Sequence, residues 1–465
     1  LKSLTRPKTV GAGAAIVAVR WTWNSDGRVA ITTASTITTA ATPMRMFFSK
    51  IDLRNLGTKL CGSGKRDEVQ AHPIRVGDQP FGCRMGLLPY GQRLREKTAS
   101  GRGQRHHAAA PDRPFLCYLA TPAVHAPHHA PAEWIDRFAG AFDGGWDALR
   151  DEIFERQLEL GVIPEGTRLT ERPEQIPAWD DYPERYRPVA SRLMECFAGF
   201  LAHTDAQIGR VIDAIEELGL GDDTLVIYIT GDNGASAEGT VHGAWSAPSF
   251  QNGFPEDPEW LLERIEDFGT ARCENHYNLA WAWALDSPFQ WMKQIASHFG
   301  GTRNAMAVQW PARIKDAGGL RSNFHHVTDI FATLLDAAGI EAPSHVNGLA
   351  QMPIDGVSMV PAFVDEKAPE NHTTQYFEMF GNRAMYHDGW IASCFHGRVP
   401  WRRFDSMPFD GPQEKWELYD IRNDFSQGND LSATHPAKLE ELQNLFDSEA
   451  RRNNIYPLKE PGQTF

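Results

Sequence analysis

The pattern of apolar and polar positions becomes regular only from about residue 111 onwards. Residues 114–119 form a short apolar run that predicts a buried strand. Apolar side chains recur at helical spacing over residues 190–218, and a Gly-Leu-Gly sequence at 219–221 ends the predicted helix. Residues 224–229 follow as a β-branched strand. This order predicts a layered α/β sheet with functional side chains at the strand ends.

The later part of the chain continues this character. Residues 240–275 are polar and irregular, and we expect them to form an excursion on the substrate side. Residues 323–339 and 437–452 carry apolar side chains at helical spacing, which predicts two further helices. Residues 111–465 are therefore expected to form one α/β domain.

Residues 1–110 differ in both pattern and charge. They show no sustained period of 3.6 or 2 residues, and they contain 18 Lys and Arg against 6 Asp and Glu, a net charge of +12. The remainder contains 28 against 54, a net charge of −26, so the whole chain carries −14. We expect residues 1–110 to be an atypical basic segment, disordered or rearranged. The acidic remainder repels nucleic acid, so no nucleic-acid partner is expected.

Composition narrows the class of protein. With 465 residues, 42% apolar and 23% charged, the chain can bury one or two ordinary cores. Its longest apolar stretch, Val10–Val19, has ten residues, whereas a membrane helix needs about 20, so no membrane association is expected. Six scattered cysteines without a CxxC pair fit a reducing, cytoplasmic location. The basic and apolar start faintly resembles a signal peptide, which keeps a periplasmic location open.

Three histidines follow the first predicted strand. His125, His128 and His129 lie in a proline-containing loop directly after that strand, where loops commonly present functional groups. Three imidazoles within five residues can bind a metal, act as acid and base, or lie exposed between stiffening prolines. The residues alone leave these alternatives open.

Asp232, Asn233 and Gly234 follow the second predicted strand. Adjacent carboxylate and carboxamide oxygens are hard ligands that suit Ca²⁺ or Mg²⁺. An Asp-Asn-Gly sequence is also a common turn, and taken alone the turn is the more frequent explanation.

Lys293 ends a segment rich in aromatic residues, Pro288–Lys293, and precedes Gly301 by eight residues. In isolation it is explained as a surface lysine whose aliphatic stem covers apolar surface. Its position in the series of motifs gives it a second interpretation.

Taken in order, these clusters resemble the sulfatase family, in particular bacterial arylsulfatases, within the alkaline-phosphatase-like superfamily. His125-Ala126-Pro127 resembles the family's His-x-Pro loop, and Asp232-Asn233-Gly234 resembles its second pair of metal ligands. Lys293 ahead of two glycines resembles the family's sulfate-binding lysine. Further landmarks follow in the family's order at Pro353–Ser358, Gly381–Ala384, Glu417–Asp420 and Asn429–Leu431. The resemblance covers about residues 111–458.

The resemblance implies a fold and a set of roles. The fold is an α/β, alkaline-phosphatase-like mixed sheet with helices on both faces, incomplete at its N-terminal end. His125 is the implied acid that faces the leaving-group oxygen, and Lys293 is the implied cation that bridges the sulfate group. Asp232 and Asn233 are implied ligands of Ca²⁺, or alternatively of Mg²⁺ or Mn²⁺. The implied partner is a small-molecule sulfate ester.

Two motifs of the family are not found in residues 1–110. The segment has no Asp-Asp pair. Neither Cys61 nor Cys83 lies in the Cys-x-Pro/Ala-x-Arg motif whose cysteine the family converts to a formylglycine nucleophile, and Ala41–Arg45 has alanine at that position. We also expect the family's small C-terminal domain to be absent or reduced.

The sequence therefore predicts a sulfatase-family protein, by descent an arylsulfatase-like sulfuric ester hydrolase, which is inactive unless it has a nucleophile. One alternative is a phosphodiesterase or phosphonate hydrolase of the same superfamily, with a nucleophile among the threonines of residues 32–42. The other is a non-catalytic relative that binds an anion or a metal.

Overall fold

The computed structural model describes residues 14–20, 33–36, 74–76, 79–81, 83–84, 114–254, 256–402 and 414–458. The predictions about Cys61, about Ala41–Arg45 and about most of the basic segment concern residues outside these ranges. Within them, no helix is both long enough and apolar enough to cross a membrane.

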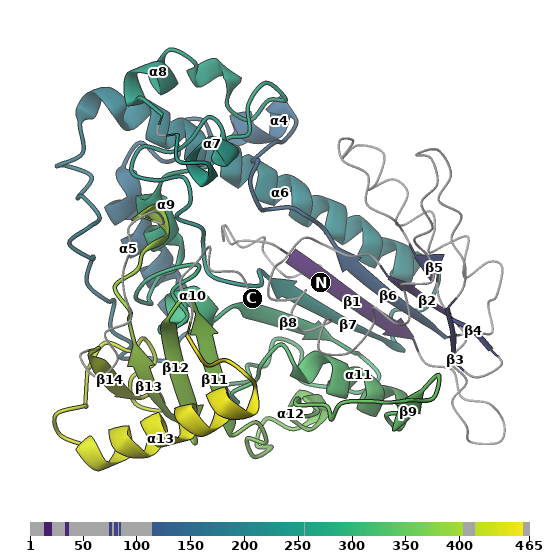
Figure 1. The fold of residues 1–465 in the computed structure, drawn as a ribbon. Helices are drawn as coiled ribbons and strands as arrows, with labels where there is room; N and C mark the ends of the chain where they lie inside the picture. The colour runs from purple at the N-terminus through teal and green to yellow at the C-terminus, as the bar shows by residue number, and fades with distance from the viewer. Residues whose placement is uncertain are drawn as a thin grey trace.

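A six-stranded mixed sheet forms the centre of the structure (Figure 1). Its order is β5-β2-β6-β1-β7-β8. The strands are β1 (Ala14–Arg20), β2 (Thr33–Thr36), β5 (Cys83–Arg84), β6 (Phe115–Ala120), β7 (Thr224–Thr230) and β8 (Ala305–Gln309). Because β1 is antiparallel to both β6 and β7, those two strands run in the same direction and their carboxyl ends lie at one edge. β2 and β5 are parallel to this pair, whereas β8 is antiparallel to β7.

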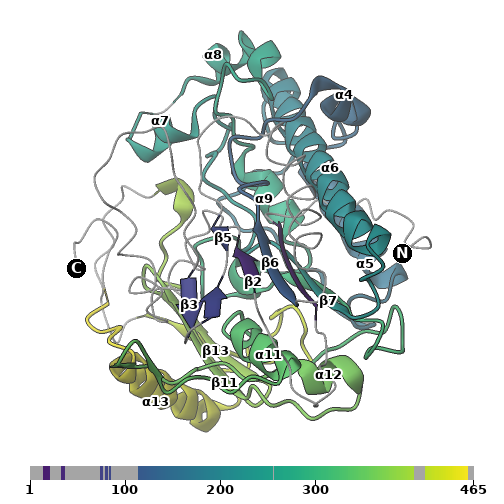
Figure 2. The same ribbon diagram turned by 90° about the vertical axis from the view of Figure 1, so that its right-hand side faces the viewer.

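Helices cover both faces of this sheet, which confirms the predicted fold class. The covering helices are α6 (Arg187–Glu217), α11 (Asp329–Ala338) and α12 (Val360–Val364). Val226 of β7 packs with residues of α6, whereas its neighbours Leu225 and Ile227 pack with residues of α11 and α12. This alternation is the period of two that a strand buried on both faces requires. Figures 1 and 2 show α6 on one side of the strands and α11 on the other.

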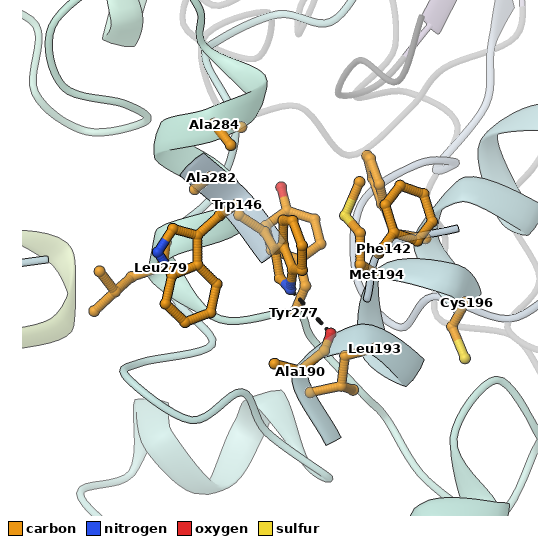
Figure 3. Packing of buried hydrophobic residues seen from close by; sticks show 14 of the residues in the cluster. Phe142, Trp146, Ala190, Leu193, Met194, Cys196, Tyr277, Leu279, Ala282 and Ala284 are labelled. Carbon is orange, nitrogen blue, oxygen red and sulfur yellow. Dashed lines mark hydrogen bonds between the residues drawn. The ribbon is translucent and has the colours of Figure 1, made fainter. Parts of the chain in front are cut away.

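The largest apolar core lies where the first half of α6 meets α4 (Ala132–Ile135), α5 (Gly145–Glu159) and α9 (Leu279–Leu285). Figure 3 shows part of this packing, including Trp146 of α5 and Leu193 of α6. Trp281 of α9 is fully buried there and donates its indole N–H to the Ala190 carbonyl at 2.9 Å. This core fixes the loops that precede and follow α9 against α6.

The expectation that the C-terminal domain is absent or reduced is wrong. A four-stranded antiparallel sheet is present, in the order β11-β12-β13-β14, with α13 on one face (Figure 1). Its elements are β11 (Thr374–Met379), β12 (Asn382–His387), β13 (Trp390–Cys394), β14 (Trp416–Asp420) and α13 (Pro436–Arg452). Met385, Ala392 and Leu418 pack against Leu442 and Phe446 of α13. Residues one position along these strands face Phe299 instead, so the sheet is buried on both sides.

The strands predicted at 114–119 and 224–229 and the helices predicted at 190–218 and 437–452 are confirmed within a few residues. The helix predicted at 323–339 begins later, at Asp329. The carboxylate of Asp329 accepts the backbone N–H of His326 at 2.9 Å, so the residues ahead of it wrap around that side chain. The remaining short elements are β3 (Ile74–Val76), β4 (Gln79–Phe81), η2 (Asp136–Phe138), η3 (Glu184–Tyr186), α7 (Ala247–Gln251), α8 (Pro258–Leu262), η4 (Ile265–Asp267), α10 (Phe299–Thr302), β9 (His345–Val346), β10 (Leu349–Ala350) and η5 (Pro400–Arg402).

Candidate active site

The predicted site residues come from three loops, two of which leave the same edge of the central sheet. His125 follows β6, and Asp232 and Asn233 follow β7. Lys293 lies between α9 and α10, and its backbone N–H donates to the Ala235 carbonyl at 3.0 Å. The third loop is therefore attached directly to the loop that carries Asp232 and Asn233.

Lys293 and His125 are in direct contact. The Lys293 Nζ lies 3.2 Å from the His125 Nε2, although the two residues are 168 positions apart in the sequence. The His125 Nδ1 lies 2.8 Å from the carbonyl oxygen of Ala126, which can only accept. These partners assign the ring hydrogen to Nδ1 and leave Nε2 as the acceptor of a Lys293 N–H. The imidazole side chain is exposed.

Asp232 lies within the electrostatic reach of both groups. Its side chain is exposed, yet partial desolvation by the surrounding chain raises the pKa of its carboxyl above the ordinary value. The positive charge of Lys293 opposes this shift, and a charge on the His125 ring would oppose it further. The structure thus places His125 and Lys293 in contact and Asp232 within electrostatic reach of both.

Asn233 and Gly234 are fixed by the backbone. The Asn233 Nδ2 donates to the Gly234 carbonyl at 2.8 Å, which leaves the side-chain oxygen as the atom that can approach a cation. The Gly234 N–H donates to the Gly301 carbonyl at 3.2 Å. A Cβ at position 234 would lie 1.6 Å from the carbonyl oxygen of Gly300, so only glycine fits this close approach.

Asp232 and Asn233 offer two oxygen ligands of the kind that Ca²⁺ binds. Ca²⁺ takes about 6–8 oxygen ligands. Within the ranges that the structure describes, no group of three or more His, Cys, Asp or Glu side chains can hold a metal ion. The residues present there fit part of a cation site but do not complete one.

Glu238 is a site residue that the sequence analysis missed. Its Oε2 lies 3.0 Å from the Lys293 Nζ and accepts the Ser236 hydroxyl at 3.0 Å, and its Oε1 accepts the Gln294 amide at 2.8 Å. Burial by itself would raise the pKa of the Glu238 carboxyl, but the charge and the hydrogen bond of Lys293 lower it to about 2. The available signal was an acidic residue in a run of small residues, five positions after Asn233.

The other two histidines of the His-Pro loop do not face this site. His128 is 1% exposed and packs against Phe197, Tyr277 and His276. Burial lowers its pKa well below the usual value, so the ring is neutral. The His129 Nε2 lies 2.6 Å from the Cys273 carbonyl. These two side chains anchor the loop, and only His125 is turned toward Lys293.

The loop that presents Lys293 has an unusual backbone. Trp291 and Gln294, on either side of it, adopt φ angles of +64° and +75°, in the left-handed region that favours glycine. The Trp291 ring stacks on Phe395 with a centroid distance of 4.2 Å. The Gln294 carbonyl accepts the Asn382 amide at 3.3 Å, from the landmark at Gly381–Ala384. The C-terminal sheet therefore helps to hold this strained loop in place.

Two family models match this chain, and together they cover most of it. The family model for Sulfatase matches residues 102–340, and the model for N-sulphoglucosamine sulphohydrolase, C-terminal, matches residues 289–453. An uncharacterized sulfatase of Schizosaccharomyces pombe is 30% identical over 340 residues, which cover 70% of this chain and 56% of that protein. An arylsulfatase of Klebsiella aerogenes is 27% identical over 253 residues, covering 54% of this chain and 52% of that protein.

The chain spans about half the length of these two relatives. Among solved structures, that of Ps i-CgsB is similar with a TM-score of 0.46 and 16% sequence identity, covering 94% of this chain and 76% of that one.

Proposed function

The chain belongs to the sulfatase family, and on this premise we propose that its site binds sulfate monoesters of the aryl type and is built for their hydrolysis. The observation that carries the proposal is the contact between the Lys293 Nζ and the His125 Nε2 beside Asp232. Hydrolysis of a sulfate ester needs a cation beside the sulfate oxygens, and either a proton source at the ester oxygen or a stable leaving group. Lys293 would supply the cation, and His125 would face the ester oxygen.

The hydrogen-bond state of His125 favours aryl leaving groups. Its Nε2 accepts from Lys293, so the resting imidazole has no proton to give from that atom. Hydrolysis breaks the S–O ester bond and releases the alcohol oxygen as an anion. A phenol has a pKa of about 10, far below that of water at about 15.7, so a phenoxide leaves with less help from an acid. An aryl sulfate therefore suits this arrangement better than an alkyl sulfate does.

Asp232 and Asn233 would supply part of the ligand set of a cation. When bound, that cation would place positive charge beside the sulfate oxygens. The nucleophile of the family resemblance belongs to residues 1–110, where its motif is not found. We therefore expect binding without efficient turnover in the chain as it stands. Lost covalent catalysis costs several orders of magnitude in rate.

A phosphodiesterase or phosphonate hydrolase is the second candidate. β2 is parallel to β6, with Thr36 opposite Tyr118, so the carboxyl end of β2 lies at the same edge as the site loops. The threonine-rich sequence of residues 32–42 continues from that end.

Turnover of an aryl sulfate and of an aryl phosphodiester, measured side by side with calcium and after chelation, tests both candidates. We expect little or no turnover of either by the chain itself. We expect aryl sulfate turnover when a normal sulfatase start replaces the segment ahead of Pro111. Aryl sulfate turnover by the unmodified chain at ordinary enzyme rates, roughly 1–1000 per second, would contradict the expectation, and mass spectrometry should then find formylglycine at Cys61 or Cys83. Phosphodiester turnover alone would favour the second candidate.

A further inference from the structure

We infer that Glu238 is a specificity-determining residue of this site. Its partly buried carboxylate, paired with Lys293, reduces the positive charge that the site offers and so favours singly charged sulfate esters over doubly charged phosphate monoesters. This inference rests on the proposed function, because it concerns the substrate class of the same site.

The Glu238–Lys293 pair is enclosed and charged. The two side chains are 14% and 16% exposed, and their nearest atoms are 3.0 Å apart. The pKa of the Glu238 carboxyl is held near 2, so it is ionised at any pH near neutrality. Such a pair is weakly screened by salt compared with a pair on the open surface.

Glu238 cannot easily turn away when an anion arrives. Gln294 donates to one of its oxygens at 2.8 Å, and Ser236 donates to the other at 3.0 Å. Its negative charge therefore stays beside the Lys293 Nζ whether or not a substrate is bound.

Lys293 can nevertheless bind one substrate oxygen. An ammonium group has three N–H donors. One is directed at Glu238 and one at His125, and no other described side chain takes the third. A sulfate oxygen can accept the third donor while the ion pair stays intact. The substrate thus meets a lysine and a glutamate whose charges sum to zero.

The repulsion from Glu238 grows with the charge of the ligand, because Coulomb energy is proportional to that charge. A sulfate monoester carries one negative charge. A phosphate monoester carries nearly two at neutral pH, since its second pKa is about 6. Glu238 therefore penalises the phosphate about twice as much in free energy, and roughly tenfold in binding is the expected scale for one unit charge at this range.

The variant Glu238→Gln removes the charge and keeps the shape. Its amide oxygen can still accept from Lys293 and Ser236, and a rotation of the Gln294 amide lets that side chain accept from the new N–H₂ group. Ser236→Ala is the matched control, because it removes a hydrogen bond to the same carboxylate oxygen and leaves the charge. Glu238→Met, uncharged and similar in shape, repeats the loss of charge independently. Thermal unfolding of each variant checks that it folds.

The measurement uses calorimetric titration of the full chain with benzenesulfonate and with phenylphosphonate, at an alkaline pH at which the phosphonate is doubly ionised. Neither ligand is hydrolysed, so the result does not depend on a nucleophile. We expect Glu238→Gln and Glu238→Met to strengthen phosphonate binding roughly tenfold more than sulfonate binding. Ser236→Ala should change the ratio by no more than about twofold.

An unchanged ratio in the two uncharged variants would overturn the inference. Lys293→Met separates this failure from a failure of the proposed function. If the parent chain binds neither anion, or if Lys293→Met binds both as the parent does, the proposed function is wrong and the inference falls with it. If binding depends on Lys293 but the ratio is indifferent to Glu238, only the inference is wrong.

Discussion

Two carboxylates, the partly buried Glu238 beside the candidate active site and the buried Asp329 at the start of α11, are partnered in different ways. Glu238 is 14% exposed, and its main partner, Lys293, keeps one N–H free of described protein partners. Asp329 is fully buried and accepts two backbone N–H groups, from His326 and Val357, each at 2.9 Å. Its other two partners are the rings of His372 at 2.7 Å and His325 at 3.2 Å.

The two clusters also differ in what they connect. Burial would raise the pKa of Asp329, but the hydrogen bonds from the two histidines and the backbone lower it well below its ordinary range. Its hydrogen bonds join the start of α11 to the residues just ahead of it and to the segments around Val357 and His372. In the Glu238 cluster, by contrast, one N–H of Lys293 has no partner among the described side chains. The comparison teaches that a carboxylate cluster can bind a ligand when its partner keeps an unused N–H donor. A cluster whose donors and acceptors are all used by the protein has only a structural role, whatever the burial of its carboxylate.

Removal of the Asp329 carboxylate should have the largest effect on stability. Asp329→Ala leaves two backbone N–H groups and two imidazoles without their acceptor, and loss of one member of a buried charge cluster typically costs about 3–5 kcal/mol. Urea unfolding should report this loss of stability. Asp336→Ala, an exposed position on the same helix, is the control and should cost no more than about 1 kcal/mol. Equal losses in the two variants would mean that Asp329 joins nothing.

Removal of the Lys293 charge should lower the affinity for an anion, and it should also lower the stability because Glu238 loses its cation. Lys293→Met removes a charge-assisted hydrogen bond to an anionic ligand, typically worth about 1.5–3 kcal/mol, so the affinity for benzenesulfonate should fall roughly 10- to 100-fold. Calorimetry measures the affinity, and unfolding measures the stability. A stability loss as large as that of Asp329→Ala, with unchanged affinity, would mean that Lys293 stabilises the fold and does not bind the anion.

His276 contacts Ser236, which in turn bonds to Glu238, and it should make the stability of the protein depend on pH. It is 2% exposed, and its ring bonds the Tyr277 carbonyl at 2.7 Å and the Ser236 hydroxyl at 3.0 Å. Burial lowers its pKa to about 4, below the unfolded value of about 6.5. Its neutral form therefore stabilises the fold fully above about pH 6.5, and this contribution is lost as the pH falls toward 4 because only the unfolded chain takes up the proton.

The part due to His276 should be about 2 kcal/mol between about pH 7 and pH 5. Unfolding of the parent and of His276→Gln at both pH values measures it, and the variant should lose less stability than the parent. His345→Gln, at an exposed position, should behave as the parent does. An identical pH dependence in the parent and in His276→Gln would show that the buried ring does not carry the effect.

The smallest expected effect is on calcium. Asp232 and Asn233 supply only two protein ligands, and water would have to supply most of the rest, so binding should be weak. Calorimetry with CaCl₂ should find no sub-micromolar affinity, and Asp232→Asn should weaken what binding there is. Sub-micromolar affinity in the parent would mean that residues outside the described ranges complete the site.

The parts of the fold that the sequence predicted are those with long or strongly patterned segments. The apolar face of α6 and the β-branched run of β7 are local signals, and both were located within a few residues. The C-terminal sheet was missed because its strands have five or six residues and are buried on both faces, which hides their alternation. α11 was drawn too long because the partners that hold Asp329 are up to 43 positions away.

Some residues of the candidate site could be predicted from the sequence and others could not. The residue types and positions of Asp232 and Asn233 pointed to a cation site, whereas Lys293 and His125 were singled out through the family resemblance. Glu238 was missed because its importance depends on Lys293, 55 positions away, and no local pattern marks that pair. The three histidines could not be separated by sequence, since burial among Phe197 and Tyr277 is what removes His128 from the site.

A crystal structure of the chain with bound benzenesulfonate tests the central claim most directly. The account predicts a sulfonate oxygen within hydrogen-bonding distance of the Lys293 Nζ, next to His125 and Asp232, with the Glu238 pair unbroken. Sulfonate bound elsewhere, or Lys293 turned to the far side from Asp232, would contradict the claim that these loops form a site for sulfate esters.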